Sequence, residues 1–438
     1  MPQVQPPEEL KEPAHMIFQC VKTRAAGTFS FGLAAAVLGL ALVAAAGLQT
    51  ACAGQPGKVN DSVSDRDFYK WLDGLRNEAK KAGISEKTLD AALGDLVPVR
   101  RVVELDRRQP EFTRSFRSYL RRRVTRKRIY RGRALLEKHR DLLENIYDEY
   151  GVAPRYLIAF WGLETHFGDH MGGFQAVEAL ATLAYDRRRA DFFRAELIHA
   201  LKIIDQGHVR PQDMTGSWAG AMGHMQFMPS TFDQYALDYT GNGRKDIWDS
   251  LPDAFASAAN FLSHIGWEPD QIWGRQVRLP KDFDLSLATL DKKKSVEKWK
   301  NLGVQAADGT ALANTATQGS IVLPQGENGP AFLVFDNFRA IMRWNRSVNY
   351  AISVGHLADR IVGLPPVFFH PNAPDETLSR NQIMEIQQNL NRLGFDAGRA
   401  DGVPGPRTRA AIRAFQKNHN LAADGYPSAK LLERLRAQ

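Results

Sequence analysis

Cysteine is almost absent from this chain of 438 residues. Cys20 and Cys52 are the only two, and both come before residue 55. The rest of the chain therefore has no disulfide framework, no thiolate metal cluster and no catalytic thiol. Hydrophobic residues make up 44% and charged residues 24% of the chain, which is ordinary for a soluble protein of two or three domains. We expect core packing alone to stabilise the fold.

Acidic residues are too few to balance the basic ones, so the formal net charge is +8. This excess favours an anionic partner, and nucleic acid, a membrane surface and an acidic cell-wall polymer all fit. The most basic segment is 114–133, where Phe116, Tyr119 and Tyr130 are candidates for stacking on bases. No nucleic-acid module signature surrounds them, so we predict a solvated basic helix face and no nucleic-acid partner.

An apolar run near the start of the chain follows a basic flank. Lys22 and Arg24 precede residues 29–48, which are apolar or small. This order is typical of an export signal, but the run is also long enough to cross a membrane as an uncleaved anchor. Both alternatives place the protein outside the cytoplasm.

Cys52 adds a third alternative for this segment. Ala51 before it resembles a bacterial lipoprotein cleavage site, although Gln49 stands where that pattern has an aliphatic residue. The same small residues also fit ordinary signal cleavage. We therefore assign residues 1–54 to an export signal or a membrane or lipid anchor, and residues 55–66 to a linker.

Apolar residues recur at helical spacing through most of residues 67–364. The range 275–330 is different, because it mixes Pro, Gly and Lys with short apolar runs. It predicts a small β-rich insertion. The predicted fold class is therefore mainly α.

The C-terminal residues follow a pattern of their own. Residues 365–377 begin with two prolines and are typical of a linker. In residues 378–438, Ser379 and Gln382 predict a capping box, and two Asp-Gly turns each precede a further helix. The pattern predicts a three-helix module.

A single carboxylate lies in an otherwise apolar and aromatic stretch. A helix can begin at Pro154 and end at Gly168, and on it Phe160 and Trp161 lie one turn from Glu164. Desolvation of this kind raises the pKa of a carboxyl group, which can then hold a proton near neutral pH and donate it to a leaving oxygen. The alternative is a surface glutamate that faces water or pairs with an arginine.

Residues 215–231 interrupt the helical pattern with glycines, methionines and aromatic residues. Ser217 and Gln226 offer hydrogen bonds beside apolar surface, which suits an N-acetylated sugar. A tightly packed buried loop is the alternative.

Residues 238–249 follow the grammar of a calcium-binding EF-hand loop, with Gly243 at the sharp turn and an Asp where the twelfth position usually has Glu. Because the loop has few charged ligands, we predict that it binds a structural Ca²⁺ with modest affinity. A metal-free Asx turn is the alternative. Asp246 would act through water. The predicted direct ligands are Asp238, Thr240, Asn242, the carbonyl of Arg244, and Asp249.

His166 and His170 have the spacing of a helical metal pair, but Gly168 between them ends the predicted helix. No Glu lies between them as in hydrolytic zinc helices. We therefore predict no zinc site.

The region from about Phe68 to Leu364 resembles the lytic murein transglycosylase B family, whose core is lysozyme-like. Four matches occur in the family's order: Trp-Gly-Leu-Glu-Thr-x-Phe-Gly around Glu164, Gly-Ser-Trp-Ala-Gly-Ala-Met-Gly through Gln-Phe-Met-Pro-Ser, the loop 238–249, and Arg343-Trp344-Asn345-x-Ser347-x-x-Tyr350. The tail from Leu378 resembles a three-helix peptidoglycan-binding domain, with departures in the turns at 403–405 and 426–427.

The resemblance implies that Glu164 is the lone catalytic acid and base, which cleaves the bond between MurNAc and GlcNAc and leaves a 1,6-anhydro end. No cofactor is required for this chemistry, and the loop 238–249 would hold calcium. Phe261 and Trp344 stand where relatives often have tyrosine, so we expect stacking to persist and one hydroxyl contact to be lost. The residues implied to line the sugar cleft are Tyr119, Ser217, Gln226, Asn345 and Tyr350.

Three other interpretations remain. A hydrolase would need a second acid about 5 Å away if retaining, or about 6.5–9.5 Å if inverting; Asp169 is the nearest in sequence, but Gly168 turns the chain before it. A non-catalytic wall-binding protein would use the C-terminal module, and a nucleic-acid protein is the weakest interpretation. We predict peptidoglycan strands and cell-wall enzyme complexes as partners, in the periplasm of the bacterial envelope, with lipid anchoring at Cys52 or an N-terminal tether as forms of membrane attachment.

Overall fold

The computed structural model describes residues 65–107, 114–370, 375 and 377–438. The predicted export or anchor segment, and almost all of the linker after it, lie outside the described residues. Within the described ranges, no helix is both long and apolar enough to cross a membrane.

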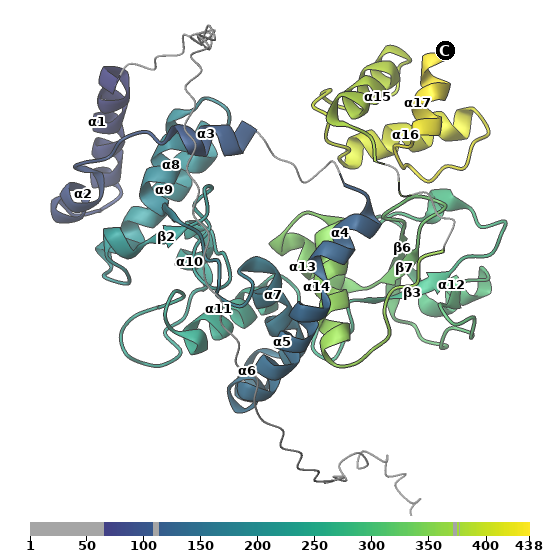
Figure 1. The fold of residues 1–438 in the computed structure, drawn as a ribbon, viewed down its shortest axis with the longest axis horizontal. Helices are drawn as coiled ribbons and strands as arrows, with labels where there is room; N and C mark the ends of the chain where they lie inside the picture. Colours follow the sequence, from purple (N-terminus) through teal and green to yellow (C-terminus); the bar gives the residue numbers. More distant parts are fainter. Residues whose placement is uncertain (1–64, 108–113, 371–374, 376) are drawn as a thin grey trace, which may run out of the picture. The chain divides into compact units, whose positions relative to one another are not determined.

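Helices dominate the first half of the described chain (Figure 1). Several begin with side-chain caps: the hydroxyls of Ser85, Ser115 and Thr125 each accept a hydrogen bond from the backbone N–H three residues later. The elements are α1 (Asp65–Lys81), α2 (Glu86–Leu93), α3 (Arg100–Arg107), α4 (Phe116–Arg123), α5 (Arg126–Lys138) and α6 (Arg140–Tyr150).

The next helices enclose the main core. All residues of α7 from Tyr156 to Leu163 are buried, and the helix packs against α5 and α14. A helix that is apolar on every side needs neighbours all around it, which explains this central position. The elements are α7 (Pro154–Glu164), β1 (Phe174–Gln175), α8 (Ala176–Tyr185), α9 (Ala190–Asp205), a short 3₁₀ helix (Pro211–Asp213), β2 (Thr215–Gly216), α10 (Pro229–Tyr235), α11 (Leu251–His264), α13 (Asp336–Trp344) and α14 (Val348–Ile361).

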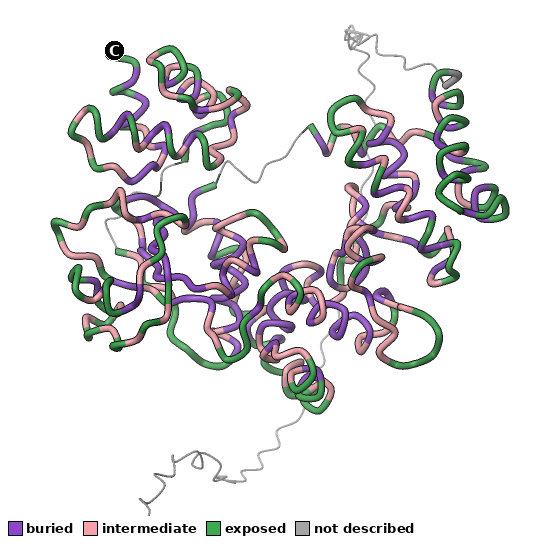
Figure 2. The backbone as a smooth tube through the Cα atoms, turned by 180° about the vertical axis from the view of Figure 1, so that it is seen from behind, coloured by how far each residue is buried: buried purple, intermediate pink, exposed green. Residues whose placement is uncertain are grey.

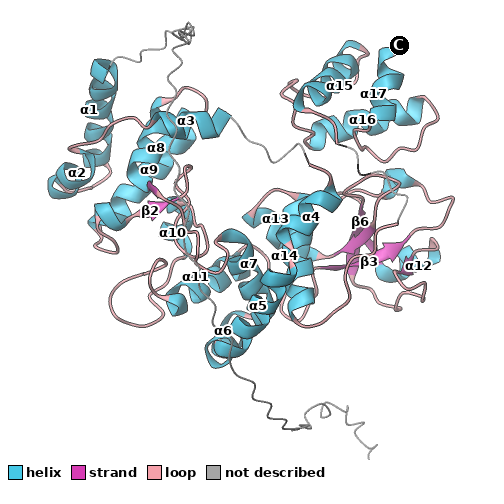
Figure 3. Cartoon of the chain, viewed as in Figure 1, coloured by secondary structure: helices cyan, strands magenta, loops and turns pink. Residues whose placement is uncertain are grey.

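A five-stranded antiparallel sheet confirms the predicted β-rich insertion (Figure 3). Its order is β4-β6-β7-β3-β5, and its own small core surrounds the fully buried Trp299. The strands extend slightly beyond 275–330 at both ends, because the apolar residues of β7 pair with β3 and β6 before the helical region resumes. The elements are β3 (Gly274–Arg278), a 3₁₀ turn (Leu285–Leu287), β4 (Lys294–Ser295), α12 (Val296–Asn301), β5 (Gln305–Ala306), β6 (Gln318–Val322) and β7 (Ala331–Val334).

The C-terminal residues form the predicted three-helix module, with α15 (Arg380–Arg392), α16 (Pro406–Asn418) and α17 (Ala429–Arg436). The capping box is present: Ser379 N donates to Gln382 Oε1 at 2.8 Å, and Gln382 N donates to Ser379 Oγ at 3.3 Å. Apolar side chains of the three helices form a core of their own, and burial alternates with exposure along each helix (Figure 2). The fold class, mainly α with a small sheet and a helical C-terminal module, is confirmed.

Candidate active site

The helix α7 ends at Glu164, four residues before the predicted end at Gly168. The chain then turns through three left-handed residues in succession, His166, Phe167 and Gly168, with φ of 55°, 63° and 87°. The prediction of a helix to Gly168 was wrong because glycine only permits the left-handed conformation, whereas here the two residues before it adopt it as well. Glu164 therefore lies at the open end of a buried helix.

Thr165 holds this turn in place and is almost fully buried. Its hydroxyl donates to the carbonyl of His224 at 2.9 Å and accepts from the N–H of Gly168 at 3.1 Å. The N–H of His224 in turn donates to the carbonyl of Ile247 at 2.9 Å. The residue next to Glu164 is thus tied to the loop 215–231, and through it to the loop 238–249.

Two hydrogen-bond donors, from α13 and α14, bind the carboxylate of Glu164. The hydroxyl of Tyr350, on α14, donates to Oε1, and the indole N–H of Trp344 donates to the same oxygen at 3.0 Å. Burial and the charge of Glu164 raise the pKa of Tyr350 well above its usual value. The phenol therefore keeps its proton and stays a donor.

Trp344 packs among aromatic neighbours, with ring centroids 4.4 Å from Phe160 and 5.2 Å from Phe261, both tilted, and 5.5 Å from Phe227, which meets it edge to face. Stacking of these rings on a sugar stays a prediction. The expected loss of a polar contact is offset, because the indole N–H supplies a donor to the carboxylate of Glu164 that a phenylalanine would lack. Sequence spacing gave no sign of this bond between residues 180 positions apart.

The helix α4 brings Tyr119 and Arg123 to the end of α7. Tyr119 is 9% exposed, and the guanidinium carbon of Arg123 lies 5.4 Å from the centre of its ring. Arg123 Nη1 donates to the carbonyl of Leu163 at 3.4 Å, directly before Glu164. Arg123 was not among the predicted site residues, since sequence alone cannot tell one arginine of a basic run from the next.

Ser217 and Gln226 are held in a tight loop. The Oγ of Ser217 accepts from Ala221 N at 3.1 Å, which leaves its own hydroxyl proton to be donated to a ligand. The amide nitrogen of Gln226 donates to the carbonyl of Met171 at 2.9 Å. The predicted role of glycine in close packing is visible at Gly216, where a Cβ would lie 2.3 Å from a backbone oxygen. The loop reaches the surroundings of Glu164 through Phe227, which packs on Trp344.

Asn345 ends α13 and is exposed. Its carbonyl accepts from the N–H of Ser347 at 2.7 Å, and the hydroxyl of Ser347 then caps α14, the helix that carries Tyr350. This turn sets Asn345 directly beside Trp344. Tyr350 thus binds the carboxylate of Glu164, Tyr119 lies near Tyr350, and Asn345 follows Trp344 directly.

Asp169, the candidate second acid, is committed elsewhere. Its carboxylate pairs with Arg131, with Nη2 and Oδ1 2.8 Å apart, and this hydrogen-bonded pair lowers the pKa of Asp169 to about 2. Nδ1 of His166 lies 3.2 Å from Nη2 of Arg128. No group of three or more His, Cys, Asp or Glu side chains in the described part of the chain is placed to hold a metal ion.

The loop 238–249 is folded by side-chain oxygens that accept from its own backbone. Asp238 accepts from the N–H of Asn242 at 3.0 Å and of Gly243 at 2.7 Å, and these bonds hold its pKa below the usual value although desolvation opposes the shift. Asp253, which lies just beyond the loop and is fully buried, accepts from the N–H groups of Tyr239 and Asp246 at 3.0 Å. Asp253 was missed because it lies outside the twelve-residue pattern.

The donor set is compatible with a hard cation but is sparse in charge. Side-chain oxygens of Asp238, Thr240 and Asn242 form hydrogen bonds within the turn, and Thr240, Asn242 and Asp249 are all exposed. Carboxylate, hydroxyl and amide oxygens are the ligands calcium prefers. The calcium site stays a prediction.

Comparison with known proteins places this geometry in a family. Residues 67–359, two thirds of the chain, match the profile described as the transglycosylase SLT domain. The chain belongs to the lytic transglycosylase family. Residues 379–435 of this transglycosylase match a family of peptidoglycan binding domains.

Several relatives of the transglycosylase are known. It is 31% identical over 249 residues to membrane-bound lytic murein transglycosylase B of Escherichia coli K12, a match that covers 56% of this chain and 66% of the relative. The sequence is also 45% identical to that of SltB3 from Pseudomonas aeruginosa, whose crystal structure was solved in complex with NAG-anhNAM-pentapeptide. The two structures superpose with a TM-score of 0.80, and the match covers 84% of this chain and 99% of SltB3. Escherichia coli Slt35 in complex with calcium is 28% identical, with a TM-score of 0.59, over 69% and 94% of the two chains.

Proposed function

We propose that this chain cleaves the β-1,4 bond between MurNAc and GlcNAc in peptidoglycan without consuming water, and that Glu164 is its acid and base. One observation carries the proposal: a single carboxylate ends a buried helix, and neutral donors from Trp344 and Tyr350 both bind its Oε1. Membership of the lytic transglycosylase family supports the same reaction.

The two donors define where the proton resides. Because Oε1 accepts two hydrogen bonds, the acidic proton belongs on Oε2 of Glu164. That proton passes to the glycosidic oxygen as the bond from C1 to this oxygen breaks. The carboxylate that remains is stabilised by Tyr350 and Trp344. It then takes the proton of the MurNAc C6 hydroxyl as that oxygen bonds to C1, so the acid is regenerated and a 1,6-anhydro end forms.

The sugar cleft is proposed to use residues from four segments: α4, α14, the end of α13 and the loop 215–231. Tyr350 of α14 binds the carboxylate, Tyr119 of α4 lies near Tyr350, and Asn345 follows Trp344 directly. Ser217 has a hydroxyl proton to donate toward an N-acetyl group, and Gln226 lies in the same loop. Hydrogen bonds beside aromatic surface suit an N-acetylated sugar.

A two-carboxylate hydrolase is the rival mechanism. It is disfavoured because Asp169, the nearest acid in sequence, is paired with Arg131. Mass spectrometry of the muropeptides released from isolated sacculi distinguishes the two: anhydro ends support the proposal, and reducing ends contradict it. Glu164→Gln is isosteric, and we expect it to release no soluble fragments while unfolding like the wild type. Fragments released by that variant at the wild-type rate would refute the assignment.

The flanking regions complete the proposal. Residues 378–438 would hold the enzyme on peptidoglycan strands, and the N-terminal segment would export it to the periplasm or attach it to the membrane. The loop 238–249 would bind a structural Ca²⁺ through Asp238, Thr240, Asn242, the Arg244 carbonyl and Asp249, with no part in the chemistry. A relative's membrane-bound name and another's calcium complex support these two points.

A further inference from the structure

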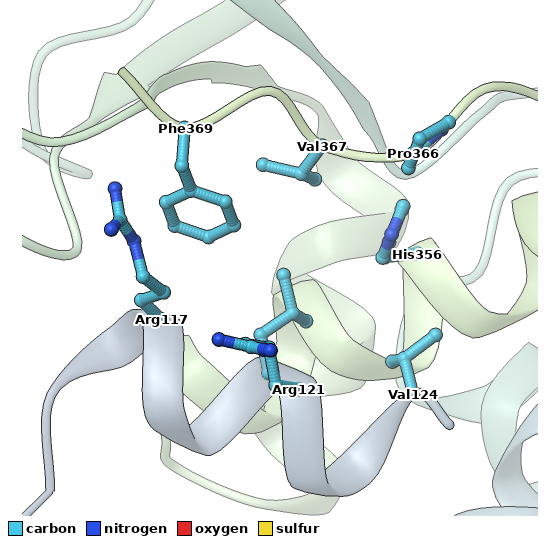
Figure 4. A pocket seen from close by; sticks show the side chains of 8 residues that line it. Arg117, Arg121, Val124, His356, Pro366, Val367 and Phe369 are labelled. Atoms are coloured by element: carbon cyan, nitrogen blue, oxygen red, sulfur yellow. The ribbon is translucent and has the colours of Figure 1, made fainter. Parts of the chain in front are cut away.

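A pocket with a volume of about 380 Å³ lies on a different face of α4 from Tyr119 (Figure 4). At 100° per residue, Tyr119 and Arg123 share one face of α4, whereas Arg117, Arg121 and Val124 share another. His356 of α14 and Phe369 of the segment that follows complete the wall. The volume falls at the lower end of the range for small-molecule sites, about 300–1,000 Å³.

The charge of the pocket wall has one sign. Arg117 and Arg121 lie one turn apart, and no lining residue is Asp or Glu. Arg117 is fixed by Phe369, whose ring centre is 4.9 Å away, and by the carbonyl of His370, which accepts from Nη2 at 2.8 Å. Its Nε is buried and has no hydrogen-bond partner. Arg121 is exposed and forms no ion pair with any described residue.

His356 is the second polar group of the pocket wall. Only 7% of its surface is exposed, and burial lowers its pKa to about 4, so the ring is neutral at pH 7. It forms no hydrogen bond with any residue of the described part of the chain, and Figure 4 shows it among the side chains that line the pocket. A neutral imidazole has one N–H to donate, so a ligand with an acceptor at this point of the wall can form a hydrogen bond with it.

We propose that this pocket binds a carboxylate of the peptide stem carried by the glycan substrate, an inference that rests on the proposed function. Guanidinium groups pair with planar carboxylates in a forked geometry, and the neutral imidazole can donate one further bond. The remaining wall is apolar and suits small side chains such as that of alanine. A phosphate polymer would also meet the charge, but it would leave the apolar wall unused.

The distance to the cleft is within reach of a stem. His356 and Tyr350 lie on the same helix six positions apart, which is about 9 Å along its axis. A five-residue peptide extends to about 17 Å. The separation along α14 is therefore shorter than an extended stem, which is the requirement for a stem attached to a sugar beside Tyr350 to place a carboxylate near Arg117 and Arg121.

The test compares Arg121→Glu with Arg122→Glu, a matched control, since both side chains are exposed on α4 and only the first lines the pocket. Affinity for NAG-NAM-pentapeptide and for the same disaccharide without peptide is measured by calorimetry, in a Glu164→Gln background that prevents turnover. We expect Arg121→Glu to weaken binding of the pentapeptide form about tenfold, as for one charge-assisted pair, and to leave the peptide-free form unchanged. Arg122→Glu should alter neither.

A second ligand separates charge from shape. Amidation of the stem carboxyl groups should weaken binding to the protein with Arg121 as much as Arg121→Glu does, and should have no further effect on that variant. Equal loss for both disaccharides, no loss for either, or tighter binding of polyglycerol phosphate than of the stem would overturn the proposal. Failure of the proposed function is read separately, as absence of anhydro ends in digests by the enzyme with Glu164 intact.

Discussion

Replacement of Thr165 by valine tests whether the turn after α7 positions the catalytic carboxylate. Valine keeps the shape of the side chain but removes the hydroxyl that joins the carbonyl of His224 and the N–H of Gly168. Removal of one partner leaves a buried group unsatisfied at a cost of about 1–3 kcal/mol, and the hydroxyl has two such partners. We therefore expect a loss of about 2–6 kcal/mol of unfolding free energy.

The activity should fall further than the stability explains. Glu164 directly precedes Thr165, so a relaxed turn moves the carboxylate away from Trp344 and Tyr350. A misplacement of about 1 Å at a catalytic group can lower the rate by about a hundredfold. We expect a decrease in kcat of between about 10-fold and 100-fold at a temperature where the variant is fully folded.

Thr165→Ser is the matched control, because it keeps the hydroxyl and loses one methyl group. It should cost about 1 kcal/mol and retain most of the turnover. Urea unfolding gives the stability, and release of anhydro-muropeptides under saturating substrate gives kcat. If the valine variant turns over as fast as the serine variant, the hydroxyl bridge does not position Glu164 and the reasoning fails.

Three further changes have distinct expected outcomes. Trp344→Phe keeps the ring stack but removes the donor to Glu164, so kcat should fall about 10-fold or more with a nearly unchanged KM, and an unchanged kcat would contradict a role for the indole N–H. Asp169→Asn should leave anhydro ends as the product, because Asp169 is paired with Arg131; loss of cleavage in this variant, with its fold intact, would favour a second acid. In the wild type the pKa of Asp169 is lowered to about 2, so its pair with Arg131 stabilises the fold above the unfolded pKa of about 4, and this stabilisation is lost as the pH falls toward 2. The difference in unfolding midpoint between the wild type and Asp169→Asn should therefore vanish in acid. Calcium should raise the melting temperature of the wild type without changing kcat, and an equal rise in Asp238→Ala would exclude the loop as its site.

Local patterns predicted the elements of this fold well. The buried faces of α7 and α14, the capping box at Ser379 and the sheet of the insertion all follow from spacing within a few turns of the chain. Local reasoning was wrong at Gly168, where the left-handed run begins before the glycine. It placed the end of the helix one turn too late.

Contacts between segments far apart in the chain could not be predicted from local sequence patterns. The bond from Trp344 to Glu164 joins residues 180 positions apart, and Arg123 is one of several arginines that the sequence does not distinguish. Family resemblance marked the position of Trp344 as unusual but not its polar contact. Asp253 escaped notice for another reason, since it organises the loop 238–249 from outside it.

The backbone of His224 links two loops, because its N–H binds the carbonyl of Ile247 and its carbonyl binds the hydroxyl of Thr165. These two bonds do not depend on the identity of the side chain, whereas a substitution would remove the third bond, in which the imidazole Nδ1 accepts from the indole N–H of Trp161 at 3.1 Å. The spacing is what matters: an insertion or deletion between His224 and Ile247 would shift the register of both bonds. A protein engineer who exchanges the loop 238–249 between relatives must therefore preserve its length at Ile247, or the exchange will change the catalytic turn as well.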